Sequence, residues 1–182
     1  MITVKQLEKR FCEQTSEDKG AVRYVCRVLQ DAGLLPIGRR GLSKNAPTLT
    51  VEQIILFIFG YYGAAAPKNA AKVAGLIATL GDELGGQTLL EIFKDYIRAW
   101  ELGGGPRDHL IVIRILFIQR DDWPSVEIET IEWNKDPDIK TTAVYGMMHD
   151  GAGYDLYKRI PAVRLPGTIF EVLATIAGEA DD

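Results

Sequence analysis

The chain has 182 residues, of which 47% are hydrophobic and 25% charged, so it is long enough and apolar enough to bury a core without disulfides or metals. Its formal net charge of −4 and its pI of about 5.3 argue against a protein that coats nucleic acid with its whole surface. No secretory signal pattern opens the chain, and the longest apolar run, residues 54–66, is too short to span a bilayer. We therefore expect a cytoplasmic protein.

The residues that usually carry metal or redox chemistry are few and scattered. Cys12 and Cys26 have neither zinc-site nor disulfide spacing, so we expect buried free thiols. His109 and His149 have no ligand-spaced partners. His149 and Asp150 are followed by two glycines, a pattern that can occur in an active-site loop. A stretch of this composition is more often a polar hairpin turn. We expect no catalytic residue, no metal and no cofactor, and hence no enzyme.

Charge is divided unevenly along the chain. Residues 1–50 hold nine basic and five acidic residues, a net charge of +4, whereas residues 51–182 hold twelve basic and twenty acidic residues, a net charge of −8. Between residues 19 and 44, six basic residues face one acid, Asp31. An acidic protein with such a local basic stretch can still bind DNA.

A short amphipathic helix is predicted in this basic stretch. Its apolar side has helical spacing and carries Ala21, Val22, Val25, Val28, Leu29 and Ala32. Gly33 is placed to end the helix. The other side carries a stripe of long donors at i, i+4, i+8 and i+11, which are Lys19, Arg23, Arg27 and Gln30.

A basic loop follows this helix. Arg39, Arg40 and Lys44 lie among Gly38, Gly41 and Pro47, where the backbone can approach another surface closely. The helix suits a major groove about 12 Å wide, and the loop suits phosphates or the minor groove. The alternative is that the stripe is only a solvated face.

An earlier helix should begin after Thr3, which forms a capping-box pattern with Gln6, and end near Gln14. Its inward residues are Val4, Leu7 and Phe11. Residues 15–18 would be the connection, with Ser16 as the cap of the basic helix. Two helices joined by such a short turn predict a helix-turn-helix, although an ordinary helical hairpin has the same pattern.

Three more helices are predicted before the glycine-rich residues 103–105. The first starts after Thr50, which pairs with Gln53 as a capping box, and is apolar nearly all round. The second starts at Pro67 and has small residues that permit close packing. The third starts after Thr88 and reaches about residue 102. We thus predict a helical domain over residues 1–102 and a linker over residues 103–108.

Beyond the linker the period of the sequence changes to that of strands. Residues 109–118 and 126–133 predict a hairpin, residues 141–147 and 155–164 supply two further strands, and residues 166–177 predict a closing helix. The predicted fold class is therefore α+β, a helical bundle followed by a small antiparallel sheet. Residues 109–182 would form an oligomerisation or interaction domain, too thin to be stable unless it packs on the helices or on another copy.

Three glutamates, Glu127, Glu129 and Glu132, alternate with apolar residues in the second predicted strand. Their simplest interpretation is a solvated face. The alternative is a docking surface for a basic protein partner.

The segment VCRVLQDAGLLPIGRRGLSKNAPTLTVEQ resembles helix-turn-helix proteins of phage and prophage clusters in proteobacteria, over about residues 20–80. Their pattern L-x-x-A-G-L-L-P-x-G-x-R-G is matched here by Leu29, Ala32, Gly33, Leu34, Leu35, Pro36, Gly38, Arg40 and Gly41. The resemblance implies a DNA-binding protein of a mobile element. No catalytic residue carries over, because that class has none.

We therefore expect a non-enzymatic protein that binds double-stranded DNA and forms a homo-oligomer, in the role of a transcriptional regulator. The alternatives are a small terminase subunit that recognises packaging DNA, and an adaptor or inhibitor that binds a protein through the acidic carboxyl half. The residues expected to contact DNA are Lys19, Arg23, Arg27, Gln30, Arg39, Arg40 and Lys44.

Overall fold

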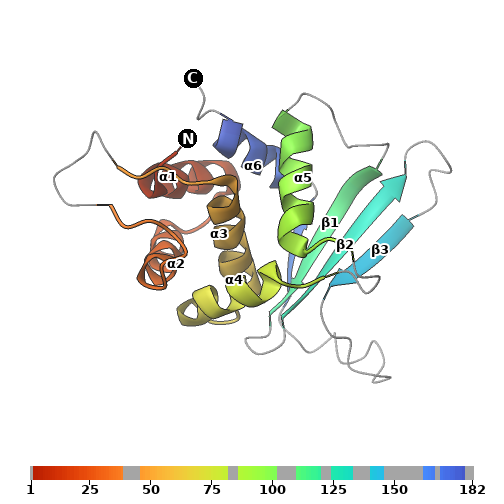
Figure 1. Ribbon diagram of the computed structural model, residues 1–182, viewed down its shortest axis with the longest axis horizontal. Helices are drawn as coiled ribbons and strands as arrows, with labels where there is room; N and C mark the ends of the chain where they lie inside the picture. Colours follow the sequence, from red (N-terminus) through yellow and green to blue (C-terminus); the bar gives the residue numbers. More distant parts are fainter. Residues whose placement is uncertain are drawn as a thin grey trace.

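The computed structural model describes residues 2–38, 46–81, 86–101, 110–119, 124–132, 140–145, 162–166 and 169–178. Over these residues the chain forms a group of helices, then an antiparallel sheet, then a last helix that returns to the first group (Figure 1). The predicted α+β class is confirmed. The elements are α1 (Val4–Thr15), α2 (Lys19–Asp31), α3 (Val51–Gly63), the 3-10 helix η2 (Pro67–Asn69), α4 (Ala70–Ala78), α5 (Leu89–Glu101), β1 (Leu110–Ile118), β2 (Ser125–Glu132), β3 (Lys140–Tyr145), β4 (Ala162–Pro166) and α6 (Ile169–Gly178).

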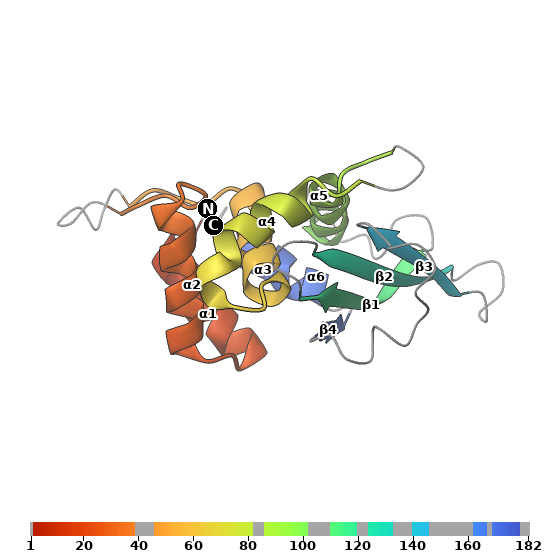
Figure 2. The ribbon, with the colours of Figure 1, turned by 90° about the horizontal axis from the view of Figure 1, so that it is seen from below.

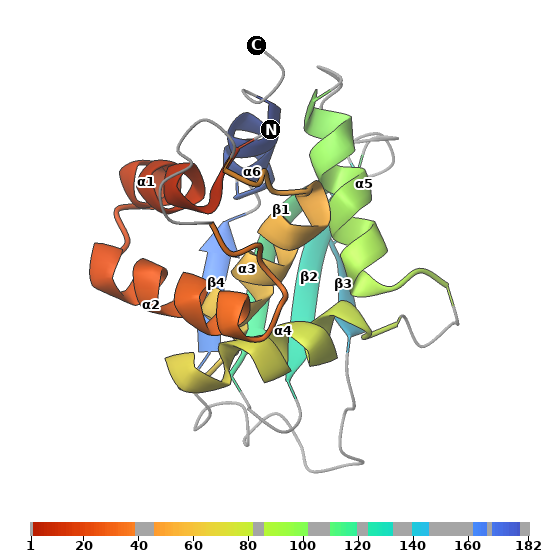
Figure 3. The same ribbon diagram turned by 60° about the vertical axis from the view of Figure 1, so that its left-hand side comes forward.

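The four strands form one sheet in the order β3-β2-β1-β4, with every neighbouring pair antiparallel. In β1 and β2, Ile115 is paired with Ile128 and Phe117 with Val126, and all four are buried. Because side chains alternate along a strand, these residues put one face of the sheet against the helices. Figure 3 shows α3 and α5 in front of that face.

The helices and the sheet share a hydrophobic core. One cluster of buried residues runs from Ile2 in the first segment to Ile176 in α6. Phe59 of α3 contacts Phe93 of α5 and Phe117 of β1, at ring-centroid distances of 4.9 and 6.2 Å. The thin sheet is thus stabilised by packing on the helices, which was one of the two solutions expected from the sequence.

The predicted starts of three helices are confirmed by their caps. Thr3 with Gln6 and Thr50 with Gln53 form complete capping boxes. The Thr88 hydroxyl accepts a hydrogen bond from the backbone N–H of Glu91 at 3.3 Å, and the Glu91 carboxylate accepts one from the backbone N–H of Thr88 at 2.7 Å. Each threonine satisfies a backbone N–H that the first helical turn leaves without a partner.

Two local predictions were wrong. Ser16 does not cap α2; it ends α1 in the left-handed conformation, with φ of 60°, and Asp18 caps α2 by accepting from the backbone N–H of Ala21 at 2.8 Å. A carboxylate is well suited to this position, because its negative charge is also stabilised by the positive end of the helix dipole. Pro67 starts the 3-10 helix η2 and not α4, which begins at Ala70.

Several expectations fall on residues outside those described. These are the linker over residues 103–108, the loop with His149 and Asp150, His109, and the first part of the strand expected at residues 155–164, of which β4 accounts for Ala162–Pro166.

Candidate nucleic-acid interface

The basic helix α2 is fixed to the molecule by its apolar side. Val22, Val25 and Leu29 are between 0% and 2% exposed, as the helical spacing predicted, and Cys26 is buried beside them. Of the other predicted residues, Ala21 and Val28 are half-buried, and Ala32 is exposed because α2 ends at Asp31. Figures 1 and 2 place α1 and α2 at the end of the molecule opposite β2 and β3.

The partner helix α1 is anchored on α3 by aromatic contacts. Phe11 is fully buried and meets Phe57 and Tyr61 edge-on, with ring centroids 5.0 and 5.5 Å apart. Edge-to-face aromatic pairs add about 0.5–1.5 kcal/mol beyond the area that they bury. The relative position of α1 and α3 is therefore well determined.

A carboxylate ties the turn between α1 and α2 to α3. Glu17 accepts hydrogen bonds from the hydroxyls of Tyr61, at 2.9 Å, and Tyr62, at 3.2 Å. Burial raises the pKa of both tyrosines, and the hydrogen bond to Glu17 and its negative charge raise these pKa values further. Both hydroxyls thus stay protonated at neutral pH and remain donors.

The two cysteines lie beneath the same helix pair as free thiols, as predicted. Burial raises the pKa of the Cys26 thiol to about 12, and burial also raises the pKa of the half-buried Cys12. Both thiols are therefore protonated at neutral pH, which makes them poor nucleophiles.

The carboxyl end of α2 is closed by the glycine that was predicted to stop it. Gly33 has φ of 76°, its N–H donates to the Gln30 carbonyl at 3.0 Å, and the Leu34 N–H donates to the Leu29 carbonyl at 2.9 Å. These two bonds make a Schellman motif, in which glycine is the residue that enters the left-handed conformation without a steric cost. The chain then turns directly toward the segment that contains the basic loop.

Three of the predicted stripe residues, Lys19, Arg23 and Arg27, are exposed along α2. The Arg23 guanidinium lies 3.8 Å from the Glu8 carboxylate of α1, with the two side chains 60% and 15% exposed. At 3.8 Å this contact is long for an ion pair, and Arg23 itself is largely in solvent, so its guanidinium can turn from Glu8 to a phosphate.

The position of Gln30 differs from the expectation. Its side chain is half-buried, and its amide nitrogen donates to the Pro36 carbonyl at 2.8 Å. The amide nitrogen of Gln30 is therefore used to hold the segment after α2, and not as a donor directed away from the core. The sequence could not distinguish the two, because Pro36 lies in an irregular segment without a period.

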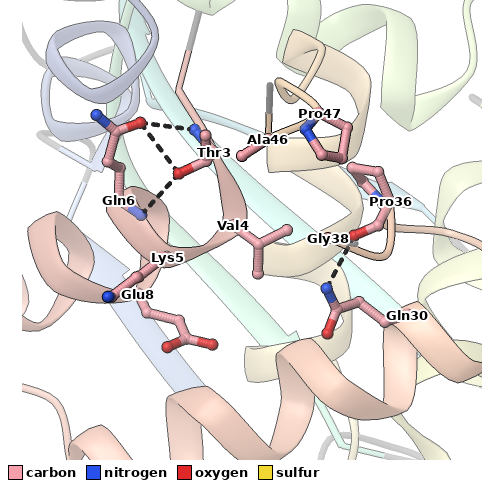
Figure 4. Close-up of a pocket in the computed structure, with 10 residues that line it drawn as sticks. All are labelled: Thr3, Val4, Lys5, Gln6, Glu8, Gln30, Pro36, Gly38, Ala46 and Pro47. Atoms are coloured by element: carbon pink, nitrogen blue, oxygen red, sulfur yellow. Dashed lines mark hydrogen bonds between the residues drawn. The ribbon is translucent and has the colours of Figure 1, made fainter. Parts of the chain in front are cut away.

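The basic loop itself, with Arg39, Arg40 and Lys44, lies outside the described residues. Both of its ends, Gly38 and Ala46, line a pocket of about 430 Å³. Figure 4 shows that the pocket lies between the start of α1 and the Gln30 side chain. Its lining residues are Thr3, Val4, Lys5, Gln6, Glu8, Gln30, Pro36, Gly38, Ala46 and Pro47.

Exposed residues beyond the predicted set also lie near α2. Tyr24 is 49% exposed on α2 itself. Lys68 of η2 and Lys72 of α4 are exposed on two elements that contact α2. The spacing of Tyr24 relative to Arg23 and Arg27 indicated its exposure, but no local pattern could place Lys68 and Lys72 beside a helix so distant in sequence.

The second surface considered from the sequence is on the sheet. Glu127 and Glu129 alternate with the buried Val126 and Ile128, so they point to the face of the sheet away from the helices. For Glu132 the structure describes only its place as the last residue of β2.

Among the described residues, no group of three or more His, Cys, Asp or Glu side chains could hold a metal ion. No helix in the described ranges has the length and hydropathy needed to cross a membrane. Comparison with protein-family models, curated proteins and solved structures finds no match. The function must therefore be inferred from the chain's own residues.

Proposed function

We propose that this protein binds double-stranded DNA through α2 and the basic loop that follows it. The observation that carries the proposal is the exposed row Lys19, Arg23 and Arg27 on a helix at one end of the molecule, leading into a segment with Arg39 and Arg40. These residues supply cations both on a helix and in the stretch of sequence that follows it.

The dimensions of α2 fit this role. A rise of 1.5 Å per residue places Lys19 and Arg27 about 12 Å apart along the helix axis, and a helix with its side chains is about 10–12 Å wide. The major groove is about 12 Å wide and admits one such helix. The Glu17 hydrogen bonds and the Phe11 contacts hold α1 and α2 in place, so little ordering entropy would be lost on binding.

We propose further that the protein is an oligomer encoded by a phage or mobile element. The role that we propose is that of a transcriptional regulator, and the alternative is a small terminase subunit. A regulator would be a dimer that binds two half-sites about one helical turn apart. A small terminase would form a larger ring. Light scattering of the purified protein distinguishes the two by mass.

The test is the binding of a labelled 30-base-pair duplex over a salt series. The variants are the double substitutions Arg23→Ala with Arg27→Ala and Arg39→Ala with Arg40→Ala. Arg98→Ala with Arg164→Ala is the control, because it removes the same charge from exposed residues of α5 and β4. We expect wild type and control to share a steep salt slope, and each test variant to lose about 2 units of it.

If the wild type does not bind the duplex at low salt, the DNA proposal is wrong. A second candidate then has support from the position of Glu127 and Glu129 on the sheet face away from the helices. This candidate is an adaptor that binds a basic protein. A labelled peptide rich in lysine and arginine should then bind the wild type, and the double variant Glu127→Gln with Glu129→Gln should lose that binding.

A further inference from the structure

Helix α2 is enclosed along both of its long sides by other elements. It contacts α1 on one side and η2 with α4 on the other, while α3 lies beneath it. Figure 3 shows α2 between α1 and α4 at the surface of the molecule. A partner that approaches the exposed face of α2 would therefore also meet the exposed residues of these two neighbours.

The side chains of α2 show which of its sides faces which neighbour. Arg23 is directed toward α1, because its guanidinium lies 3.8 Å from Glu8. Ala21 and Val28 lie on the opposite side of the helix by their spacing of 100° per residue, and both are half-buried. That side consequently packs toward η2 and α4.

Both neighbours of α2 present lysines at the surface. On α1, Lys5 and Lys9 are exposed and lie next to Glu8, on the solvent side of the helix. On the other side, Lys68 is exposed in η2, and Lys72 is exposed on α4, opposite the buried Ala70 and Val73. Lys68 and Lys72 thus lie on one side of α2, while the lysines of α1 on the other side share their helix with Glu8 and with Glu13, which pairs with Lys9 at 3.8 Å.

The outer arc of α2 between these neighbours carries Tyr24 and Arg27, which are both exposed. Acidic residues lie at the two ends of the helix: Asp18 caps its start, and Asp31 is its last residue, one turn beyond Arg27. Because both carboxylates repel phosphates, the middle of α2 is favoured as the point of entry.

We infer that Lys68 and Lys72 contact the phosphates on one rim of a DNA major groove that α2 enters, while α1 faces the other rim. This inference rests on the proposed function. A helix that fills the groove has a row of phosphates along each of its two sides. Cations on the elements beside the helix can therefore neutralise these phosphates. The occupant is double-stranded DNA, since a single strand offers only one row of phosphates.

The experiment measures the binding of a labelled 30-base-pair duplex of random sequence to the full chain, from low to high salt. The double variant Lys68→Ala with Lys72→Ala should lower the salt slope by about 2 units, one for each lost phosphate contact. The charge-preserving variant Lys68→Arg with Lys72→Arg should keep the slope of the wild type. The control, Arg98→Ala with Arg164→Ala, removes equal charge from exposed residues of α5 and β4, outside α2, η2 and α4, and should also keep it.

The outcomes separate this inference from the proposed function. If the variant of Arg23 and Arg27 loses slope but the alanine variant of Lys68 and Lys72 does not, the inference is wrong and the DNA proposal stands. An equal loss in the control variant would also overturn the inference, because the effect would then be one of net charge. If the wild type shows no binding, both fail. Circular dichroism of each variant checks that the exposed substitutions leave the fold intact.

Discussion

Glu17 is the residue that joins the turn between α1 and α2 to α3. Both oxygens of its carboxylate are used, one by Tyr61 and one by Tyr62, whose side chain is 4% exposed. Hydrogen bonds to a charged group are stronger than neutral ones, and a buried hydroxyl that loses its partner carries the full cost of desolvation. One side chain thereby stabilises the position of the helix pair that we propose to bind DNA.

The variant Glu17→Ala should lower the free energy of unfolding by about 2 kcal/mol, since it leaves two tyrosine hydroxyls without their acceptor. Urea denaturation measures this change. Glu13→Ala is the matched control, because Glu13 is 60% exposed and its ion pair with Lys9 spans 3.8 Å. It should change stability by less than about 0.5 kcal/mol.

A triple variant that combines Glu17→Ala with Tyr61→Phe and Tyr62→Phe tests this reason. If it is no more stable than Glu17→Ala alone, the unpaired hydroxyls do not cause the loss of stability. Under our interpretation the phenylalanines remove the groups that need an acceptor, so part of the lost stability should return.

Helices α3 and α4 approach each other closely because of glycines in α3. A Cβ at Gly60 would lie 3.0 Å from the backbone oxygen of Ala70, and one at Gly63 would collide with a methyl carbon of Ile77. Of the small residues of α4 that the sequence indicated, Ala70 faces Gly60, whereas Gly63 faces the larger Ile77 and Val73. Gly75 of α4 is different, since a Cβ there would meet nothing within 4 Å.

Alanine should therefore have opposite effects at two helical glycines. Gly60→Ala should destabilise the protein by about 1–3 kcal/mol, because the obstructing atom belongs to the backbone and cannot move aside cheaply. Gly75→Ala should stabilise it by about 0.5–1 kcal/mol, since alanine restricts the unfolded chain and favours helix. Thermal and urea unfolding of the two variants measure the difference. Destabilisation by both would contradict the close-packing account.

At the scale of the whole molecule, α6 connects the carboxyl half to the helical part. Phe170 is 1% exposed, and its ring centroid lies 4.9 Å from that of Phe93 and 4.8 Å from that of Tyr96, both in α5. The Gln119 amide also donates to the Tyr62 carbonyl at 3.0 Å. Residues from both sides of the linker predicted at 103–108 thus share one core, and the division into two domains stays a prediction.

Phe170→Ala should lower the free energy of unfolding by about 3–5 kcal/mol, the usual cost of removing a buried ring. Because the core is shared, the loss of helix seen by far-ultraviolet circular dichroism and the change in tryptophan fluorescence should occur at the same urea concentration. The neighbouring exposed residue provides the control, as Glu171→Ala should have little effect. Two separate transitions in the wild type would show that the halves fold independently.

Local patterns in the sequence predicted the succession of helices and strands and the starts of three helices. Threonine followed by glutamine three residues later predicted the caps at Thr3 and Thr50, and threonine before an apolar helical pattern predicted the cap at Thr88, because a cap interaction lies within one helical turn. Gly33 predicted the end of α2 for the same reason. The cap of α2 was wrongly assigned to Ser16. Ser16 and Asp18 both carry a side-chain oxygen suited to a cap, and local pattern does not choose between them.

The composition of the candidate interface depended on contacts between distant residues. Sequence periodicity alone found Lys19, Arg23 and Arg27, since they share one side of a single helix. Packing between separate segments produces the remaining contacts. These are the hydrogen bond from Gln30 to Pro36, the hydrogen bond from Tyr61 to Glu17, and the position of Lys68 beside α2. No period or cap encodes such contacts. The sequence by itself therefore determined the elements and their apolar sides, and the tertiary structure decided which polar groups remain available to a partner.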